Sequence, residues 1–427
     1  MNPLAQQLNT QIQNESPAVH DMLSSLGKNL FYPKGILSQG AEASEKAHKF
    51  NATIGIATEH GEPMHFSHIQ KRIDYAPKDV YPYAPPQGKP ALRDAWLEKL
   101  YKDNPSMVGK SIGKPIVTNA LTHGLSILAD LFMNEGDALV VPNHYWGNYN
   151  TVFGVRRGGK IVTFPLFAEN TRFDTNGLRE ALAEQSGKAI VLLNFPNNPT
   201  GYTPHEDEAN EIVDVLKEAA DNGLNLVVVL DDAYFGLFYE DSITESLFGR
   251  LAGVHDRILP VKIDGATKEN YVWGLRVGFI TYAAGKETLA ALEQKTKGII
   301  RGTISSGAHI SQTMILESLQ SPEFEVEKQQ KFDVMKGRAV KTKEILSDAK
   351  FDKHWTYYPF NSGYFMCVKL HEIDAEELRL HLLDQYGVGV ISNNQTDIRV
   401  AFSCVDEEDL TELFDLIYQA CEDLTTN

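Results

Sequence analysis

Cysteine is scarce in this chain of 427 residues, which contains three: Cys367, Cys404 and Cys421. They lie far apart and form no C-x-x-C pair, so the sequence offers neither a disulfide framework nor a thiol pair for a metal. Such sparse cysteines are typical of a reducing cytoplasm, where we expect this protein to reside. The 13 histidines include no H-E-x-x-H or comparable spacing, and we expect no metal site.

Long apolar runs and an excess of basic residues are also absent. No apolar run approaches the roughly 20 residues that span a membrane. The segment Met1–Leu8 lacks the basic and apolar regions of a signal peptide. With 40 basic and 57 acidic residues the formal net charge is −17, which argues against a nucleic-acid-binding surface. We therefore expect neither a membrane nor nucleic acid among its partners.

The sequence does contain an alternation of short apolar segments with longer helical patterns, from about Lys114 to Tyr282. This alternation predicts an α/β fold with a mostly parallel sheet covered by helices. After about Ser321 the pattern changes to that of a smaller α+β domain, and a chain of this length exceeds one hydrophobic core. We predict a large domain over residues 61–320 and a small domain built from residues 1–60 with 321–427.

The predicted elements are short apolar strands and amphipathic helices. In the large domain the strands are Ala138–Val141, Lys160–Phe164, Ala189–Leu193, Leu226–Leu230, Leu259–Ile263 and Val277–Tyr282. Helical spacing marks His123–Leu131 and Glu206–Ala220. In the small domain the strands are Gly363–Leu370 and Asp397–Ser403, and the helices are Glu323–Ala349, Ala375–Gln385 and Glu407–Leu424.

Polar residues follow three of the predicted strands and carry the chemistry of the chain. Asn198 follows one strand, Asp231 and Tyr234 end another, and Lys268 and Arg276 lie in a loop between two more. A buried lysine can form a Schiff base with a carbonyl, and an arginine can hold a phosphate. Each motif alone is a common turn. In this order, at the strand ends where ligands bind, they are the polar groups that hold pyridoxal phosphate.

Together these segments resemble the aspartate aminotransferase superfamily of pyridoxal-phosphate enzymes, and within it the class I aminotransferases. The segments Pro142–Tyr149 and Tyr83–Gly88 are similar to the Trp-Gly-Asn and Tyr-x-Pro-x-x-Gly segments of that class, and the resemblance runs from Asn51 to Arg399. It implies the fold of this family, with a large cofactor-binding domain and a smaller α+β domain. It also implies a homodimer with shared active sites.

The resemblance assigns roles to the residues at the strand ends. Lys268 would hold the cofactor and then move a proton between the substrate Cα and the cofactor carbon. Asp231 would pair with the ring nitrogen, so that the ring can accept electrons. The D-x-A-Y match and strand alternation favour Asp231 over Asp232. Tyr234 and Asn198 would donate hydrogen bonds to the ring oxygen.

The same resemblance implies the rest of the cofactor site. Arg276 and the start of a helix, at Ala120, Leu121 and Thr122, would bind the phosphate. Tyr83 of a neighbouring subunit would also contact it. Trp146 would stack on the ring, although plain core packing is the alternative reading. Two positions depart from the family pattern: Gly265 replaces a small hydroxyl residue, and Ala120 replaces a glycine.

The resemblance also implies that two arginines recognise the substrate. Arg399 would bind the substrate α-carboxylate through a two-pronged hydrogen bond, next to Asn198. Asn51 and Gly55 resemble a segment that closes over substrate. Arg301 would read a distal carboxylate, which selects aspartate or glutamate; alternatively it faces elsewhere or touches the phosphate of a neighbouring subunit.

The expected reaction is transamination between an L-amino acid, dicarboxylic or aromatic, and a 2-oxo acid such as 2-oxoglutarate. The same scaffold also hosts other chemistry. A carbon–sulfur lyase would use the same lysine, aspartate and carboxylate clamp. A non-catalytic regulatory module that binds pyridoxal phosphate is the third possibility, and the acidic chain without a helix-turn-helix segment disfavours it.

Overall fold

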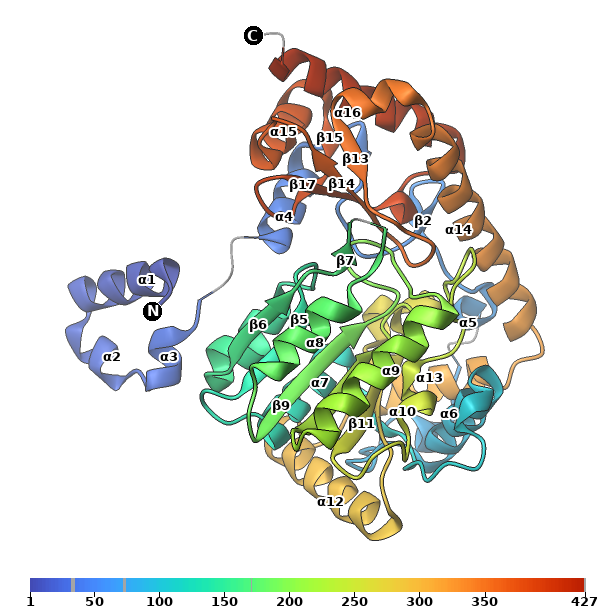
Figure 1. Cartoon of the computed structure of the whole chain (residues 1–427). Helices are drawn as coiled ribbons and strands as arrows, with labels where there is room; N and C mark the ends of the chain where they lie inside the picture. The colour runs from blue at the N-terminus through green and yellow to red at the C-terminus, as the bar shows by residue number, and fades with distance from the viewer. Residues whose placement is uncertain (32–34, 72–73, 170, 426–427) are drawn as a thin grey trace.

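The computed structural model describes residues 1–31, 35–71, 74–169 and 171–425. Its centre is a seven-stranded sheet (Figure 1). In spatial order the strands are β4 (Ile116–Asn119), β12 (Val277–Tyr282), β11 (Ile258–Gly265), β10 (Asn225–Asp231), β9 (Lys188–Asn194), β5 (Ala138–Pro142) and β6 (Lys160–Phe164). β12 runs antiparallel to both of its neighbours, and the pairs from β11 to β6 are parallel. The predicted α/β fold with a mostly parallel sheet is thus confirmed.

Helices cover both faces of this sheet because its strands are apolar on both sides. In β10, Leu226 and Val228 belong to one apolar core and Val227 and Val229 to another. This is the alternation expected of a strand that is buried on two faces. The helices α8 (Thr175–Ala183) and α9 (Glu206–Asp221) contribute to the first core, and α7 (Ala120–Phe132) and α12 (Lys286–Thr303) to the second.

A smaller antiparallel sheet lies beyond one end of the large one (Figure 1). Its order is β13 (Trp355–Tyr357), β14 (Met366–Leu370), β17 (Asp397–Val400) and β16 (Ile391–Ser392). Its apolar core includes side chains of α14 (Phe324–Leu346), α15 (Ala375–His381) and α16 (Leu410–Thr425). The N-terminal part of the chain joins this region, since β1 (Phe50–Asn51) pairs with β15 (Val388–Gly389) and α4 (Ile36–Lys46) packs on β15 and β16.

The first three helices form a lobe that projects from the rest of the chain (Figure 1). They are α1 (Pro3–Glu15), α2 (Pro17–Met22) and α3 (Ser25–Asn29), and α1 packs on the other two. α1 buries Ala5, whereas no described side chain of α2 or α3 is buried.

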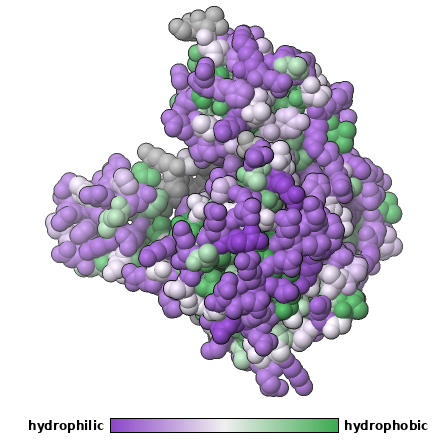
Figure 2. All heavy atoms as spheres, viewed as in Figure 1, coloured by the Kyte–Doolittle hydropathy of each residue, from purple (hydrophilic) through white to green (hydrophobic). Residues whose placement is uncertain are grey.

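Hydrophilic residues cover most of the molecular face seen in Figure 2. No helix within the described ranges is both long and apolar enough to cross a membrane.

Several predicted boundaries were wrong. The predicted strand Asp397–Ser403 ends at Val400, because Ala401 donates its N–H to Ala52 and the chain then turns into a short 3₁₀ helix, Phe402–Cys404. The predicted strand Gly363–Leu370 begins only at Met366. β4 was not predicted at all, since four residues between a proline and a helix give little periodic signal. The proposed domain boundaries remain a prediction.

Candidate active site

A pocket at the carboxyl edge of the large sheet gathers most of the predicted site residues. It has a volume of about 300 Å³. Eleven of the predicted residues line it: Gly55, Ala120, Leu121, Thr122, Trp146, Asn198, Asp231, Tyr234, Lys268, Arg276 and Arg399. Parallel strands bring their carboxyl ends to one edge, which explains why residues far apart in the sequence meet here.

Lys268 lies in the short helix α11 (Ala266–Glu269), directly after β11. Its Nζ donates a hydrogen bond to the carbonyl oxygen of Gly55 at 3.0 Å and lies 5.1 Å from the centroid of the Tyr234 ring. Burial, and then the nearby guanidinium groups of Arg399 and Arg276, lower the Lys268 pKa from 10.5 to about 8. The amine is therefore far easier to deprotonate than that of an exposed lysine.

Asp231 ends β10 and lines the pocket, and one of its two carboxylate oxygens has no hydrogen-bond partner. Tyr149 donates its hydroxyl to Oδ2 at 2.6 Å, while Asn194 donates its side-chain amide to the Asp231 carbonyl at 2.7 Å. Oδ1 is buried and has no hydrogen-bond partner. Burial, opposed by the Tyr149 hydrogen bond, raises the Asp231 pKa to about 6. The carboxylate is thus held in place with one oxygen left for a ligand.

Asp232 points away from this pocket. Its carboxylate pairs with Lys262, which is fully buried, and the Lys262 amine also lies 3.5 Å from Asp264. A buried charge needs such a partner. Asp231 lines the pocket and Asp232 does not, and the role of Asp231 toward the ring nitrogen remains a prediction.

The first turn of α7 and Arg276 form a site suited to an anion. Asn119 at the N-cap makes no side-chain capping bond, so the first N–H groups of the helix stay available. Ala120 has a φ of 62°, in the left-handed region that favours glycine, at a cost of about 1 kcal/mol. Arg276 also has a positive φ, 55°, and lines the same pocket.

Arg399 lies in β17 of the small sheet and reaches the pocket from the opposite side. It donates from Nη1 to Asn198 Oδ1 at 3.0 Å and from Nη2 to the Thr53 carbonyl at 2.7 Å. Its guanidinium lies 4.1 Å from the centroid of the Phe365 ring. Nε is buried without a partner, so the planar group keeps a free donor for a carboxylate.

Two predicted site residues lie outside the pocket of a single chain. Tyr83 is 93% exposed, and Arg301 is exposed near the end of α12, where it bonds to Ser305. Neither lines the pocket. Their predicted roles, contact with a neighbour's phosphate for Tyr83 and with a distal carboxylate for Arg301, remain predictions.

The sequence did not single out five residues that line the pocket, Tyr149, Asn194, Ala233, Thr267 and Phe365. Tyr149 and Asn194 lie within the segments that mark the site, three residues after Trp146 and four before Asn198. Their places in the sequence could therefore have marked Tyr149 and Asn194 as candidate site residues. The direction of each side chain could not be predicted, because it depends on long-range packing.

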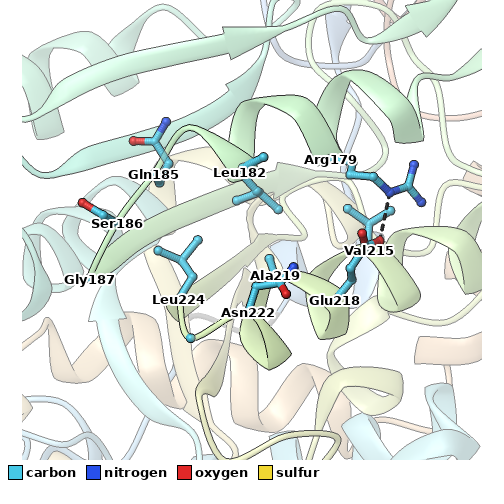
Figure 3. A pocket seen from close by; sticks show the side chains of 12 residues that line it. Arg179, Leu182, Gln185, Ser186, Gly187, Val215, Glu218, Ala219, Asn222 and Leu224 are labelled. Atoms are coloured by element: carbon cyan, nitrogen blue, oxygen red, sulfur yellow. Dashed lines mark hydrogen bonds and ion pairs between the residues drawn. The ribbon is translucent and has the colours of Figure 1, made fainter.

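A larger surface cavity of about 440 Å³ lies between α8 and α9 (Figure 3). Its walls include Leu182, Val215 and Leu224, and Arg179 pairs with Glu218 at 2.9 Å on one side. Gly187, which precedes β9, places this cavity at the amino ends of the parallel strands. Ligands of such sheets bind at the carboxyl ends, so the smaller pocket is the candidate site.

Comparison with known proteins agrees with this geometry. Residues 60–417 match the family model described as aminotransferase class I and II. This chain belongs to that family. The aminotransferase therefore has pyridoxal 5′-phosphate as its cofactor, as the strand-end residues predicted.

Its relatives by sequence are aspartate aminotransferases and similar enzymes. The aspartate aminotransferase of Bacillus sp. (strain YM-2) is 28% identical over 307 residues, which covers 70% of this chain and 72% of the relative. A probable aspartate/prephenate aminotransferase of Rhizobium leguminosarum bv. phaseoli is 27% identical over 91% of this chain and 96% of its own. These matches span most of the aminotransferase.

Solved structures share the fold. An aminotransferase from Anaerococcus prevotii superposes with a TM-score of 0.82 at 24% identity, covering 93% of this chain and 98% of that one. The kynurenine aminotransferase of Pyrococcus horikoshii gives a TM-score of 0.80 at 16% identity, covering 95% and 98%. At these identities the likeness concerns the fold.

The pocket of the aminotransferase fits pyridoxal phosphate on its own evidence. The unpaired Oδ1 of Asp231 matches the protonated ring nitrogen, and the amine of Lys268 matches the carbonyl carbon. The free N–H groups of α7 and the side chain of Arg276 match the phosphate. These groups face one cavity whose volume suits a small cofactor with its substrate.

The lowered pKa of Lys268 predicts how the apoprotein takes up its cofactor. Only the neutral amine attacks a carbonyl, and its fraction rises as the pH increases through the pKa of about 8. We expect the rate of pyridoxal phosphate uptake, followed by absorbance between about pH 6 and pH 10, to rise with a midpoint near 8. A rate that does not change with pH, or one that still climbs through 10.5, would contradict this environment for Lys268.

Proposed function

We propose that this aminotransferase transfers the amino group of a dicarboxylic or aromatic L-amino acid to a 2-oxo acid such as 2-oxoglutarate. One observation carries the proposal. One pocket is lined by Lys268 with its lowered pKa, by Asp231 with an unpaired carboxylate oxygen, and by Arg399 with an unpaired Nε. An amine, an acid and a carboxylate clamp are what amino transfer requires of the protein.

Each residue has a distinct task in this proposal. Pyridoxal phosphate, when bound, supplies the carbonyl that captures the amino group and a ring that accepts electrons. Lys268 would act as the general base and acid that moves the proton of the substrate Cα. Arg399 holds the α-carboxylate and thereby fixes the Cα–H bond toward Lys268. Asp231 would pair with the ring nitrogen and keep a positive charge on it.

Contacts within the chain support this division of tasks. Asn198 accepts from Arg399 at 3.0 Å and lines the pocket, so the carboxylate clamp and the cofactor site are positioned together. Tyr234 is buried, its ring lies near the Lys268 amine, and it lines the same pocket as Asn198. Trp146 meets Tyr149 edge to face with centroids 5.7 Å apart, which fixes one aromatic wall of the pocket.

The proposal includes a homodimer with shared sites and a cytoplasmic location. Tyr83, 93% exposed in one chain, is available to a neighbouring subunit. The sparse cysteines are consistent with a reducing compartment. The printed names of the relatives, aspartate and aspartate/prephenate aminotransferase, support substrates of the dicarboxylic or aromatic kind.

The half-reactions test the proposed function. Purified protein loaded with pyridoxal phosphate should lose its yellow absorbance band when aspartate, glutamate or an aromatic amino acid is added, and regain it with 2-oxoglutarate. A band that persists through the whole panel would contradict amino transfer. Release of pyruvate from cystathionine without an added oxo acid would instead favour the carbon–sulfur lyase.

Arg301 offers a test of substrate choice. If it reads a distal carboxylate in the assembled dimer, Arg301→Ala should lower kcat/KM for aspartate and glutamate by roughly 10²-fold and leave aromatic amino acids nearly unchanged. The matched control is Arg257→Ala, because that arginine is exposed and bonds to Asn225, at the amino end of β10. Equal losses for both substrate classes would rule out this role for Arg301.

A further inference from the structure

Thr267 carries a buried hydroxyl group that has no partner in the protein. The residue precedes Lys268 in α11, its side chain lines the active-site pocket, and the residue is 4% exposed. Its Oγ1 makes no hydrogen bond. A buried hydroxyl without a partner is costly and uncommon. One that faces a binding pocket therefore points to a ligand atom as its partner.

Three other residues that line this pocket are suited to binding an anion. Arg276 lines it, and Ala120 and Thr122 lie in the first turn of α7, whose N-cap residue makes no side-chain bond. β11, which leads into Thr267, pairs with β12, which begins directly after Arg276. The unpaired hydroxyl of Thr267 thus belongs to the same part of the pocket as Arg276 and the N-terminus of α7.

Gly265, the last residue of β11, has no room for a side chain that could supply a hydroxyl. A Cβ atom there would lie 2.6 Å from the Val277 carbonyl oxygen and 2.8 Å from the Gly278 Cα. Both contacts are with backbone, which cannot move aside cheaply. A hydroxyl at this end of β11 therefore has to come from Thr267.

We infer that Thr267 is a cofactor-binding residue whose Oγ1 donates a hydrogen bond to the phosphate of pyridoxal phosphate. A phosphate dianion accepts such a bond strongly, because hydrogen bonds to ionised groups exceed those between neutral groups. Arg276 supplies the charge, and Thr267 supplies a neutral donor that adds no further positive charge beside the Lys268 amine. This inference rests on the proposed function of the site.

Binding of two cofactor analogues to the apoprotein tests the inference without turnover. Pyridoxamine 5′-phosphate carries the phosphate, pyridoxamine does not, and neither forms a covalent bond with Lys268. In calorimetric titrations, Thr267→Val, which keeps the shape and removes the hydroxyl, should bind pyridoxamine 5′-phosphate roughly 10- to 100-fold more weakly than the wild type. Its affinity for pyridoxamine should not change, and Thr267→Ser should stay close to the wild type.

Thr281 provides a matched control. It is fully buried in β12 and its hydroxyl is also unpaired, but it does not line the pocket. Thr281→Val should therefore leave both affinities unchanged. If Thr267→Val does not fold, Thr267→Ala carries the same comparison. Unchanged affinity for pyridoxamine 5′-phosphate, or an equal loss for both analogues, would overturn the inference. Wild-type protein that binds neither analogue would instead refute the proposed function.

Discussion

Replacing Lys268 with alanine is expected to lower the turnover of amino transfer by about 10⁴-fold, the upper range for loss of a general acid–base group. The amine is the group in the pocket with both the position and the lowered pKa to move the proton. Cofactor binding should survive in part, since the phosphate site and Asp231 are untouched. Single-turnover absorbance measurements with the best amino donor would measure the loss.

A matched control separates this effect from a general loss of lysine charge. Lys295 is exposed on α12, so Lys295→Ala should retain full turnover. Adding a small primary amine to Lys268→Ala should restore part of the rate, because the space left by the side chain opens into the pocket. A Lys268→Ala protein with turnover within tenfold of the wild type would contradict the assignment.

Asp231→Asn should lower turnover by roughly 10²- to 10³-fold, the cost of removing a buried charge from its partner. An asparagine keeps the size and accepts the Tyr149 hydrogen bond, but it cannot hold a positive charge on the ring nitrogen. We expect the cofactor to remain bound and the Cα–H step to slow, so that deuterium at the substrate Cα reduces the rate further. Stopped-flow rates with protonated and deuterated donor would measure this.

Tyr149→Phe is a milder change at the same carboxylate than Asp231→Asn. It removes only the donor to Oδ2 and leaves the carboxylate in place, so a loss of about tenfold is expected. Melting curves for both variants would show whether the fold is retained. Full turnover of Asp231→Asn with bound cofactor would refute the role of Asp231.

The strand-end residues could be predicted because their signals are local. The apolar runs before Asp231 and Lys268 are strands β10 and β11 in the structure, and parallel strands bring their carboxyl ends together whatever the intervening sequence. Similarly, Arg399 lies in a short strand as its apolar neighbours predicted. Local pattern and parallel topology therefore account for the residues at the strand ends, whereas the family resemblance implied that Arg399 and Trp146 belong to the same site.

Contacts that depend on distant packing could not be predicted in this way. The Gly55 carbonyl that accepts from Lys268 lies 213 residues away in sequence. The hydroxyl of Tyr149 reaches Asp231 across 82 residues of sequence. Tyr149 directly precedes a helix with π geometry, Asn150–Val155, which the sequence pattern did not predict. The choice between Asp231 and Asp232 rested on the D-x-A-Y match and on strand alternation, whereas the ion pair that holds Asp232 to the buried Lys262 could not be predicted.

The most direct test is to identify the residue that carries the cofactor. Protein loaded with pyridoxal phosphate is reduced with borohydride, which fixes the carbon–nitrogen bond between the lysine and the cofactor, and is then digested and analysed by mass spectrometry. The pocket predicts a single modified peptide with the label on Lys268. A label on another lysine, or no label after reduction, would contradict the assignment of this pocket as the active site.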